Sequence, residues 1–163
     1  MTETAVLENR STRSDLSLQV SRVIAAERSR VYQAWTRPEL IAQWFAPGKT
    51  ITNITSDPRP GGEYRFDFFG MPCDADTAAP QVPSAVNVVG VYQEVVPDER
   101  ISYTWRGSRF PDEDTLVTVT FKDAEGGTEV TIRHENFSTA EIMSPHNLGW
   151  EGALTSLENF LKK

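Results

Sequence analysis

The sequence is poor in the residues that build disulfides and metal sites. It has one cysteine, Cys73, so no disulfide can form within the chain. A zinc site needs three or four cysteine, histidine or carboxylate ligands close together. Cys73, Asp74 and Asp76 lie close in the sequence, but neither of the two histidines, His134 and His146, is near them. We therefore expect no metal and no other cofactor.

Motifs of nucleophilic and nucleotide chemistry are also missing. The sequence has no Gly-x-Ser-x-Gly elbow, no histidine near Cys73 and no glycine-rich phosphate loop. The acidic triplet at residues 112–114 is typical of a solvated turn. No catalytic residue is predicted on these grounds, and whether the chain is an enzyme stays open at this point.

Basic residues are outnumbered by acidic ones, 16 to 23, which gives a net charge of −7. Nucleic acids and anionic membrane surfaces are bound largely through lysine and arginine, so neither is an expected partner. No apolar run approaches the length that spans a membrane, and the first 15 residues lack the apolar core of a signal peptide. A cytoplasmic location is therefore expected.

The spacing of apolar residues predicts an α+β fold, and the length fits one domain. Residues 1–14 are expected to form a mobile tail, and residues 15–163 the domain. A first strand near residues 16–24 precedes two short helices, within residues 27–36 and 38–45. Alternating apolar residues then predict strands as far as His134. Ser138 and Glu141 have the spacing of a capping box, and Ser144-Pro145 offers a second helix start. A long helix is expected from about Pro145 to Leu161.

The predicted strands are rich in large aromatic residues on one face. Successive strands joined by short turns make an antiparallel meander, and the final helix should lie across its concave side. Gly90, inside a long strand, indicates a bulge or a bend, and the loop from Gly70 to Ala85 is expected to cover the interior as a lid. Whether the aromatic residues fill the interior or line a hollow stays open.

Short motifs occur in an order and spacing that resemble a known family. They are Arg22, Ile24, Val31, Ala34-Trp35-Thr36, Pro38-Glu39, Trp44, Pro47, Pro60-Gly61-Gly62-Glu63-Tyr64, Gly90, Glu94, Pro97, Tyr103-Thr104-Trp105, Gly127-Thr128, His134 and Gly149-Trp150. From Ser14 to Lys163 the chain is similar to the START-like (SRPBCC) superfamily of helix-grip proteins. Within it, the chain resembles the single-domain bacterial relatives of the C-terminal domain of the activator of Hsp90 ATPase.

This resemblance implies a curved sheet of about six or seven strands around a C-terminal helix, with a mostly apolar cavity between them. It favours binding or sequestration of a small hydrophobic metabolite, with aromatic ones included, without catalysis. Two alternatives stay open: a cyclase or hydratase acting on such a ligand, and a protein-interaction module linked to a chaperone. An Hsp90-type partner is not expected, because the full-length activator relies on a further N-terminal domain. A homodimer is left open.

The expected ligand-binding residues are those that should face the interior: Trp44, Phe66, Phe68, Tyr103, Trp105, His134, Trp150 and Leu154. His134 has two interpretations, a ligand or acid-base contact and a core histidine satisfied by its neighbours. His146 is expected to be an exposed residue at the start of the helix. Arg106 and Arg133 should face the outer side of the sheet.

Overall fold

The computed structural model describes residues 16–46, 49–70 and 84–162. In this part of the chain the elements follow in the order β1 (Leu18–Ile24), α2 (Arg28–Thr36), α3 (Pro38–Trp44), β2 (Thr50–Ser56), β3 (Glu63–Gly70), β4 (Ser84–Val96), β5 (Arg100–Gly107), β6 (Thr115–Ala124), β7 (Gly127–Glu135) and α4 (Ala140–Leu161). The expected tail at residues 1–14 and nearly all of the expected lid lie outside the described residues.

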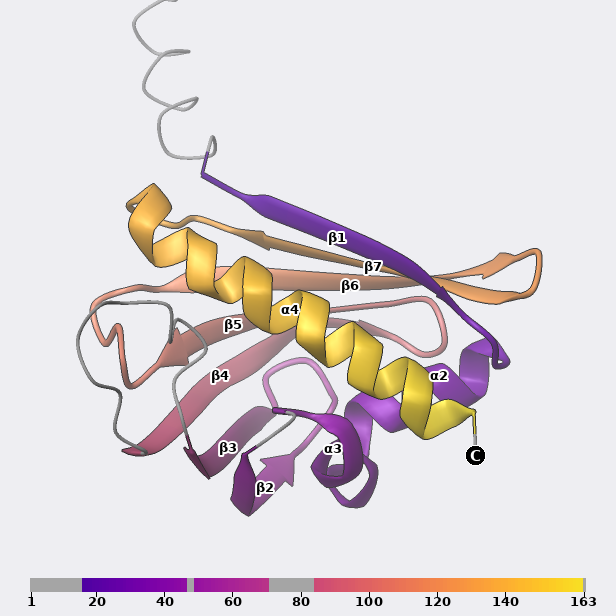
Figure 1. Cartoon of the computed structure of the whole chain (residues 1–163), viewed down its shortest axis with the longest axis horizontal. Coiled ribbons are helices and arrows are strands. Elements are labelled where there is room, and N and C mark those ends of the chain that lie inside the picture. The colour runs from indigo at the N-terminus through magenta and orange to yellow at the C-terminus, as the bar shows by residue number, and fades with distance from the viewer. Residues whose placement is uncertain (1–15, 47–48, 71–83, 163) are drawn as a thin grey trace, which may run out of the picture.

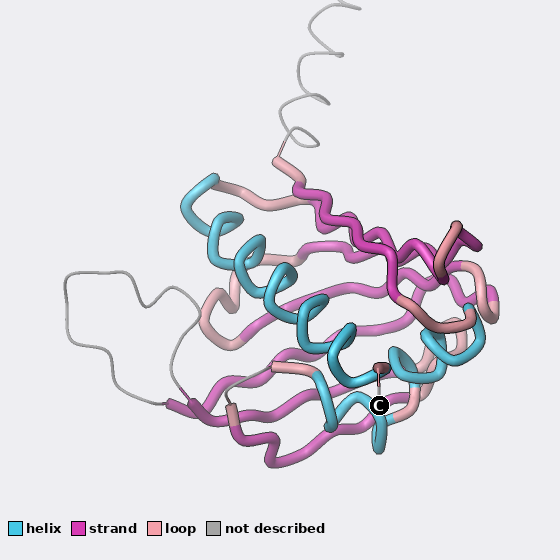
Figure 2. Tube along the Cα trace, turned by 45° about the vertical axis from the view of Figure 1, so that its right-hand side comes forward, coloured by secondary structure: helices cyan, strands magenta, loops and turns pink. Residues whose placement is uncertain are grey.

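The seven strands form one antiparallel sheet in the order β1-β7-β6-β5-β4-β3-β2. From β2 to β7 each strand pairs with the next in the chain, and β1 closes the sheet beside β7. The sheet curls into a half-barrel, and α4 crosses its concave side (Figure 1). Figure 2 shows the same helix, in cyan, running across the magenta strands. The predicted α+β helix-grip fold is confirmed.

The interior is built by side chains that alternate along the strands. Along β6 and β7 every second residue is buried, as the period of a strand requires, and these residues are Thr115, Val117, Val119, Phe121, Thr128, Val130, Ile132 and His134. The opposite face is polar, and both Arg106 and Arg133 are exposed there as predicted. No helix within the described ranges is long and apolar enough to cross a membrane.

Helix α4 begins at Ala140, beside the first of the two starts that the sequence offers, so the expected start of the long helix at about Pro145 was wrong. Thr139 caps the helix by accepting a hydrogen bond from a backbone N–H of the first turn at 3.2 Å. The hydroxyl of Ser138 instead donates to the Glu113 carboxylate at 2.6 Å. Pro145 lies inside the helix, where its missing N–H removes one helical hydrogen bond. A Ser-Pro pair is typical of a helix start, which explains the error.

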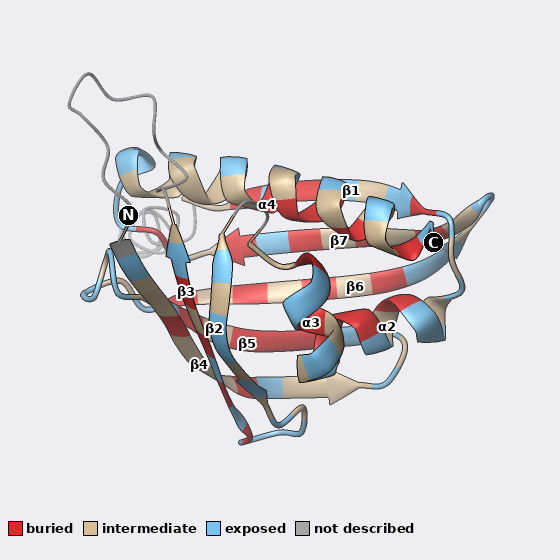
Figure 3. Cartoon of the chain, turned by 60° about the horizontal axis from the view of Figure 1, so that its bottom comes forward, coloured by how far each residue is buried: buried red, intermediate tan, exposed pale blue. Residues whose placement is uncertain are grey.

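Helices α2 and α3 lie over the same concave side of the sheet, next to the C-terminal half of α4 (Figure 3). Trp35 of α2 connects the layers. Its ring is 4.9 Å from that of Trp44, and it stacks on Trp150 of α4 at 6.3 Å with an angle of 18°. The three helices thus share one aromatic core.

Gly90 allows β4 and β5 to approach closely, and the bulge in β4 lies between Tyr92 and Glu94. A Cβ atom at Gly90 would stand 1.9 Å from the Thr104 carbonyl oxygen and 2.6 Å from the Tyr64 ring. The Tyr64 hydroxyl itself donates to that carbonyl oxygen at 2.5 Å. No side chain fits between these groups, so the close approach of the two strands here requires glycine.

We expect Gly90→Ala to lower the free energy of unfolding by about 3 kcal/mol, because the added methyl group overpacks rigid backbone. Gly107→Ala is the matched control: it also replaces a strand glycine, but its Cβ would meet nothing closer than 3.9 Å. The control should change stability by less than about 1 kcal/mol. Urea unfolding of both variants measures the difference, and equal losses would contradict the assigned role of Gly90.

Candidate functional site

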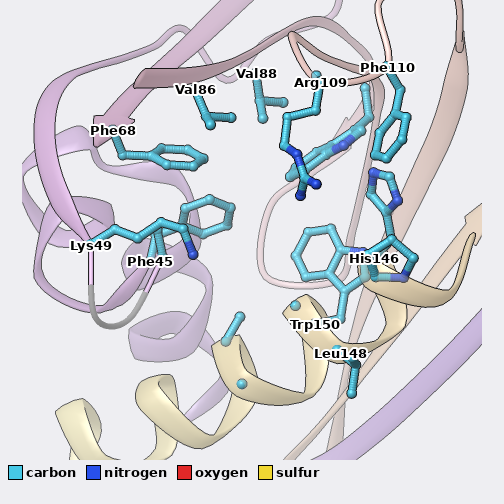
Figure 4. A pocket seen from close by; sticks show the side chains of 17 residues that line it. Phe45, Lys49, Phe68, Val86, Val88, Arg109, Phe110, His146, Leu148 and Trp150 are labelled. Atoms are coloured by element: carbon cyan, nitrogen blue, oxygen red, sulfur yellow. The ribbon is translucent and has the colours of Figure 1, made fainter. Parts of the chain in front are cut away.

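A pocket of about 340 Å³ lies between α4 and the sheet. Its walls come from the segment after α3, from strands β3 to β5, from the loop after β5 and from α4 (Figure 4). The lining residues are Phe45, Ala46, Lys49, Phe68, Val86, Val88, Trp105, Gly107, Arg109, Phe110, Pro145, His146, Leu148, Gly149, Trp150, Gly152 and Ala153. Most of these are aliphatic or aromatic, so the pocket is predominantly apolar.

The pocket is hollow because small residues stand where the fold could have placed large ones. On α4, Gly149, Gly152 and Ala153 line the space, and none of them has a side chain longer than a methyl group. On β5, Gly107 follows Trp105 by two residues and so shares its inward face. Small residues on both walls therefore leave room between the helix and the sheet.

The other half of the interior is filled. Around Trp35, Trp44, Tyr64 and Tyr103 the remaining void is only about 10 Å³. Here α4 contributes leucines instead of glycines: Leu154, Leu157 and Leu161 are all buried. The aromatic interior is therefore divided, with a packed core under the C-terminal half of α4 and an open pocket nearer its start.

The predicted ligand-binding residues fall into two groups. Phe68, Trp105 and Trp150 line the pocket. The other five do not line it; they are buried around it and support its walls: Trp44, Phe66, Tyr103, His134 and Leu154. Contact of any of them with a ligand stays a prediction.

Several lining residues were not predicted from the sequence. Lys49, Arg109 and Phe110 lie in connecting segments, where no periodic pattern shows which way a side chain points. His146 was expected to be exposed, and this was wrong. It is half-buried and lines the pocket, and its Nδ1–H donates to the Ile142 carbonyl at 2.8 Å. The row of small residues beside Trp150 was the one signal that could have indicated a hollow.

A chain of hydrogen bonds fixes His134 in the core. The indole Nε1–H of Trp150 donates to His134 Nδ1 at 3.0 Å. Because an indole can only donate, Nδ1 must be the acceptor and the ring proton must lie on Nε2. That proton is donated to the Thr115 hydroxyl at 2.8 Å, and this hydroxyl donates in turn to the Trp105 carbonyl at 2.8 Å.

These contacts require a neutral His134. A second ring proton on Nδ1 would point at the indole N–H of Trp150, which is also a donor. Burial lowers the pKa of His134 well below its usual value, and the neighbouring His146 lowers it further. Burial also lowers the pKa of His146, while its bond to the Ile142 carbonyl opposes this. His134 is thus a core histidine satisfied by its neighbours.

Trp105 differs from the other three tryptophans. Trp35 donates to the Tyr103 hydroxyl, Trp44 to the Ala34 carbonyl, and Trp150 to His134. The indole N–H of Trp105 has no hydrogen-bond partner among the described residues, although the residue is only 9% exposed and lines the pocket. The nitrogen itself is buried, so this group is an exception to the rule that buried donors are nearly always satisfied.

Two cationic side chains stand at the rim of the pocket. Lys49 is half-buried and Arg109 is exposed, and their nitrogen-bearing ends point into the space beside Phe45, Phe68 and Trp150 (Figure 4). Among the described lining residues, Lys49, Arg109 and His146 are the ionisable ones, and none is a carboxylate.

The chain matches the family model described as Activator of Hsp90 ATPase homolog 1-like protein over residues 25–162. A solved structure from Chromobacterium violaceum is 29% identical, covers 88% of this chain and 95% of its own, and has a TM-score of 0.68. One from Rhizobium leguminosarum is 28% identical, with coverages of 90% and 93% and a TM-score of 0.66. An AHSA1-like protein from Aeromonas hydrophila, 22% identical with coverages of 90% and 92%, shares the fold at a TM-score of 0.71. No curated protein matches the chain.

The lowered pKa values of His134 and His146 predict that stability falls in weak acid. In the unfolded chain each histidine takes up a proton below about pH 6.5, whereas the folded pKa values are lower. The unfolded state then binds more protons, so the free energy of unfolding should fall by up to about 1.4 kcal/mol per pH unit for each histidine.

In His134→Gln one of these two contributions is absent. The decline in unfolding free energy between about pH 7 and pH 5 should therefore be shallower in the variant than in the unchanged protein. Urea unfolding at a series of pH values measures the slope of unfolding free energy against pH in both proteins. The carboxylates are the same in both, so they contribute equally to the two slopes. Identical slopes would show that His134 does not have a lowered pKa.

Proposed function

As the chain belongs to the family of Activator of Hsp90 ATPase homolog 1-like proteins, we propose that it binds a small hydrophobic ligand without catalysis. The fold of this family suggests ligand binding, and the observation that carries the proposal is the pocket beneath α4. Its volume of about 340 Å³ lies at the low end of the roughly 300–1,000 Å³ that ligand sites occupy. A compact ligand fits this space better than a long lipid.

Apolar walls provide the driving force for binding. Each Å² of apolar surface removed from water contributes about 25 cal/mol, and a ligand in the pocket would cover both its own surface and that of the walls. Phe45, Phe68, Trp105 and Trp150 present aromatic rings to the space. Such rings favour a ligand with flat aromatic or alicyclic parts, because aromatic pairs gain energy beyond their buried area.

The arrangement of the histidines favours a binding protein over an enzyme. Both ring nitrogens of His134 are engaged in the core, and the ring does not line the pocket. His146 does line it, but no carboxylate among the described lining residues could act with it as an acid-base partner. Efficient general acid-base catalysis needs a group within hydrogen-bond reach of the reacting atom and with a suitable pKa.

Filling the pocket should abolish binding without unfolding the protein. In Gly107→Leu the new Cβ would meet neighbours no closer than 3.9 Å, and the side chain would extend from the inward face of β5 into the hollow. We expect affinity for the neutral fluorescent probe N-phenylnaphthylamine to fall at least tenfold, by about 1.4 kcal/mol or more. A fluorescence titration measures this loss.

Arg106→Leu is the matched control, because the same side chain is introduced on the same strand but on the exposed outer face. It removes one surface ion pair with Asp114, which is typically worth less than about 1 kcal/mol. This variant should bind the probe as the unchanged protein does. Equal binding by Gly107→Leu and the unchanged protein, or no binding by either, would argue against the pocket as a ligand site.

A further inference from the structure

We propose that the ligand is a phenol: a compact aromatic compound whose ring lies in the pocket and whose hydroxyl donates a hydrogen bond to Nε2 of His146. The inference rests on the proposed function, because it specifies the chemistry of the ligand in the same pocket. It is carried by the position of the His146 ring and by the hydrogen bond that fixes its proton.

The bond between His146 and its own helix decides which ring nitrogen carries the proton. Nδ1 lies 2.8 Å from the Ile142 carbonyl oxygen, and a carbonyl oxygen can only accept, so the proton is on Nδ1. Burial lowers the pKa of His146, which favours the neutral ring at neutral pH. In that ring Nε2 has a lone pair and no proton, so it is a hydrogen-bond acceptor.

This acceptor is unpartnered but not buried. In the part of the chain that the structure describes, nothing is hydrogen-bonded to Nε2. Buried side-chain nitrogens and oxygens without a partner in that part comprise only the indole nitrogen of Trp105, so Nε2 borders open space. Because Nδ1 turns back to the carbonyl of the preceding helical turn, Nε2, on the far side of the ring, points away from the α4 backbone.

Packed rings hold the His146 side chain in place. Its ring centre lies 5.0 Å from that of Phe137, 5.1 Å from that of His134 and 5.6 Å from that of Phe110. His146 also lines the pocket, at the end where Phe110 stands (Figure 4). An acceptor on a ring that is already fixed can bind a ligand without a further loss of side-chain freedom.

A phenol satisfies both features of this part of the pocket. Its flat ring suits the aromatic walls, and its hydroxyl is a donor for Nε2. A hydrocarbon in the same place would cover Nε2 and leave the acceptor desolvated and unpaired, which lowers affinity. An ionised carboxylate would bring only acceptors to this nitrogen. The acceptor therefore selects a neutral ligand that carries a donor.

A matched pair of ligands isolates the hydrogen bond. 2-Naphthol and 2-methylnaphthalene have nearly the same size and shape, but only the naphthol can donate. In His146→Phe an aromatic ring is kept and the acceptor is lost, so the bound hydroxyl would be unpaired. We expect isothermal titration calorimetry, with protein titrated into ligand, to show affinity for 2-naphthol reduced at least about fivefold. Affinity for 2-methylnaphthalene should change less than about twofold, which also shows that the variant is folded.

His146→Gln is the conservative variant, because the glutamine amide oxygen can still accept a hydrogen bond. It should lose less affinity for 2-naphthol than His146→Phe does. Unchanged binding of 2-naphthol by His146→Phe, or an equal loss for both ligands, would overturn the phenol proposal while the hydrophobic pocket stands. If neither ligand binds and Gly107→Leu has no effect on the fluorescent probe, the proposed function itself fails.

Discussion

The hydrogen-bond chain from Trp150 through His134 and Thr115 to the Trp105 carbonyl is the constraint on which the site depends. It joins α4 to β7, β6 and β5 in a single run of directional contacts. Hydrophobic burial alone sets no register between a helix and a sheet, because it is non-directional. A chain of hydrogen bonds in which every group has its partner fixes one arrangement of the helix on the sheet. In this arrangement the glycines of α4 face the sheet.

The divided interior follows from this fixed arrangement. If α4 could settle deeper, its glycine-rich segment would close onto Trp105 and remove the hollow. The indole of Trp150 sits between helix and sheet as a spacer, 5.1 Å from the Trp105 ring. Close packing elsewhere, around Trp35 and Trp44, stabilises the fold, so the open part need not contribute to that stability.

Much of the fold could be predicted because strand alternation and helical spacing are local signals. Alternating residues in β3, β5, β6 and β7 marked the inner face, and the motifs predicted the family that the family model then matched. The long helix was expected from the second of two candidate starts, whereas α4 begins beside the first, with Thr139 rather than Ser138 as the cap. The rim of the pocket was missed because the direction of Lys49 and Arg109 depends on how loops pack, which no periodicity encodes.

The separation of core and pocket along one helix has a consequence for how this protein can change over evolutionary time. Residues that line the pocket, such as Gly152 and Arg109, are distinct from buried core residues, such as Leu157. Substitutions at the pocket should therefore lower the free energy of unfolding less than substitutions in the core do. This matters because that free energy is small and most mutations reduce it. The lining of the hollow can therefore change by a few substitutions while the chain remains folded throughout.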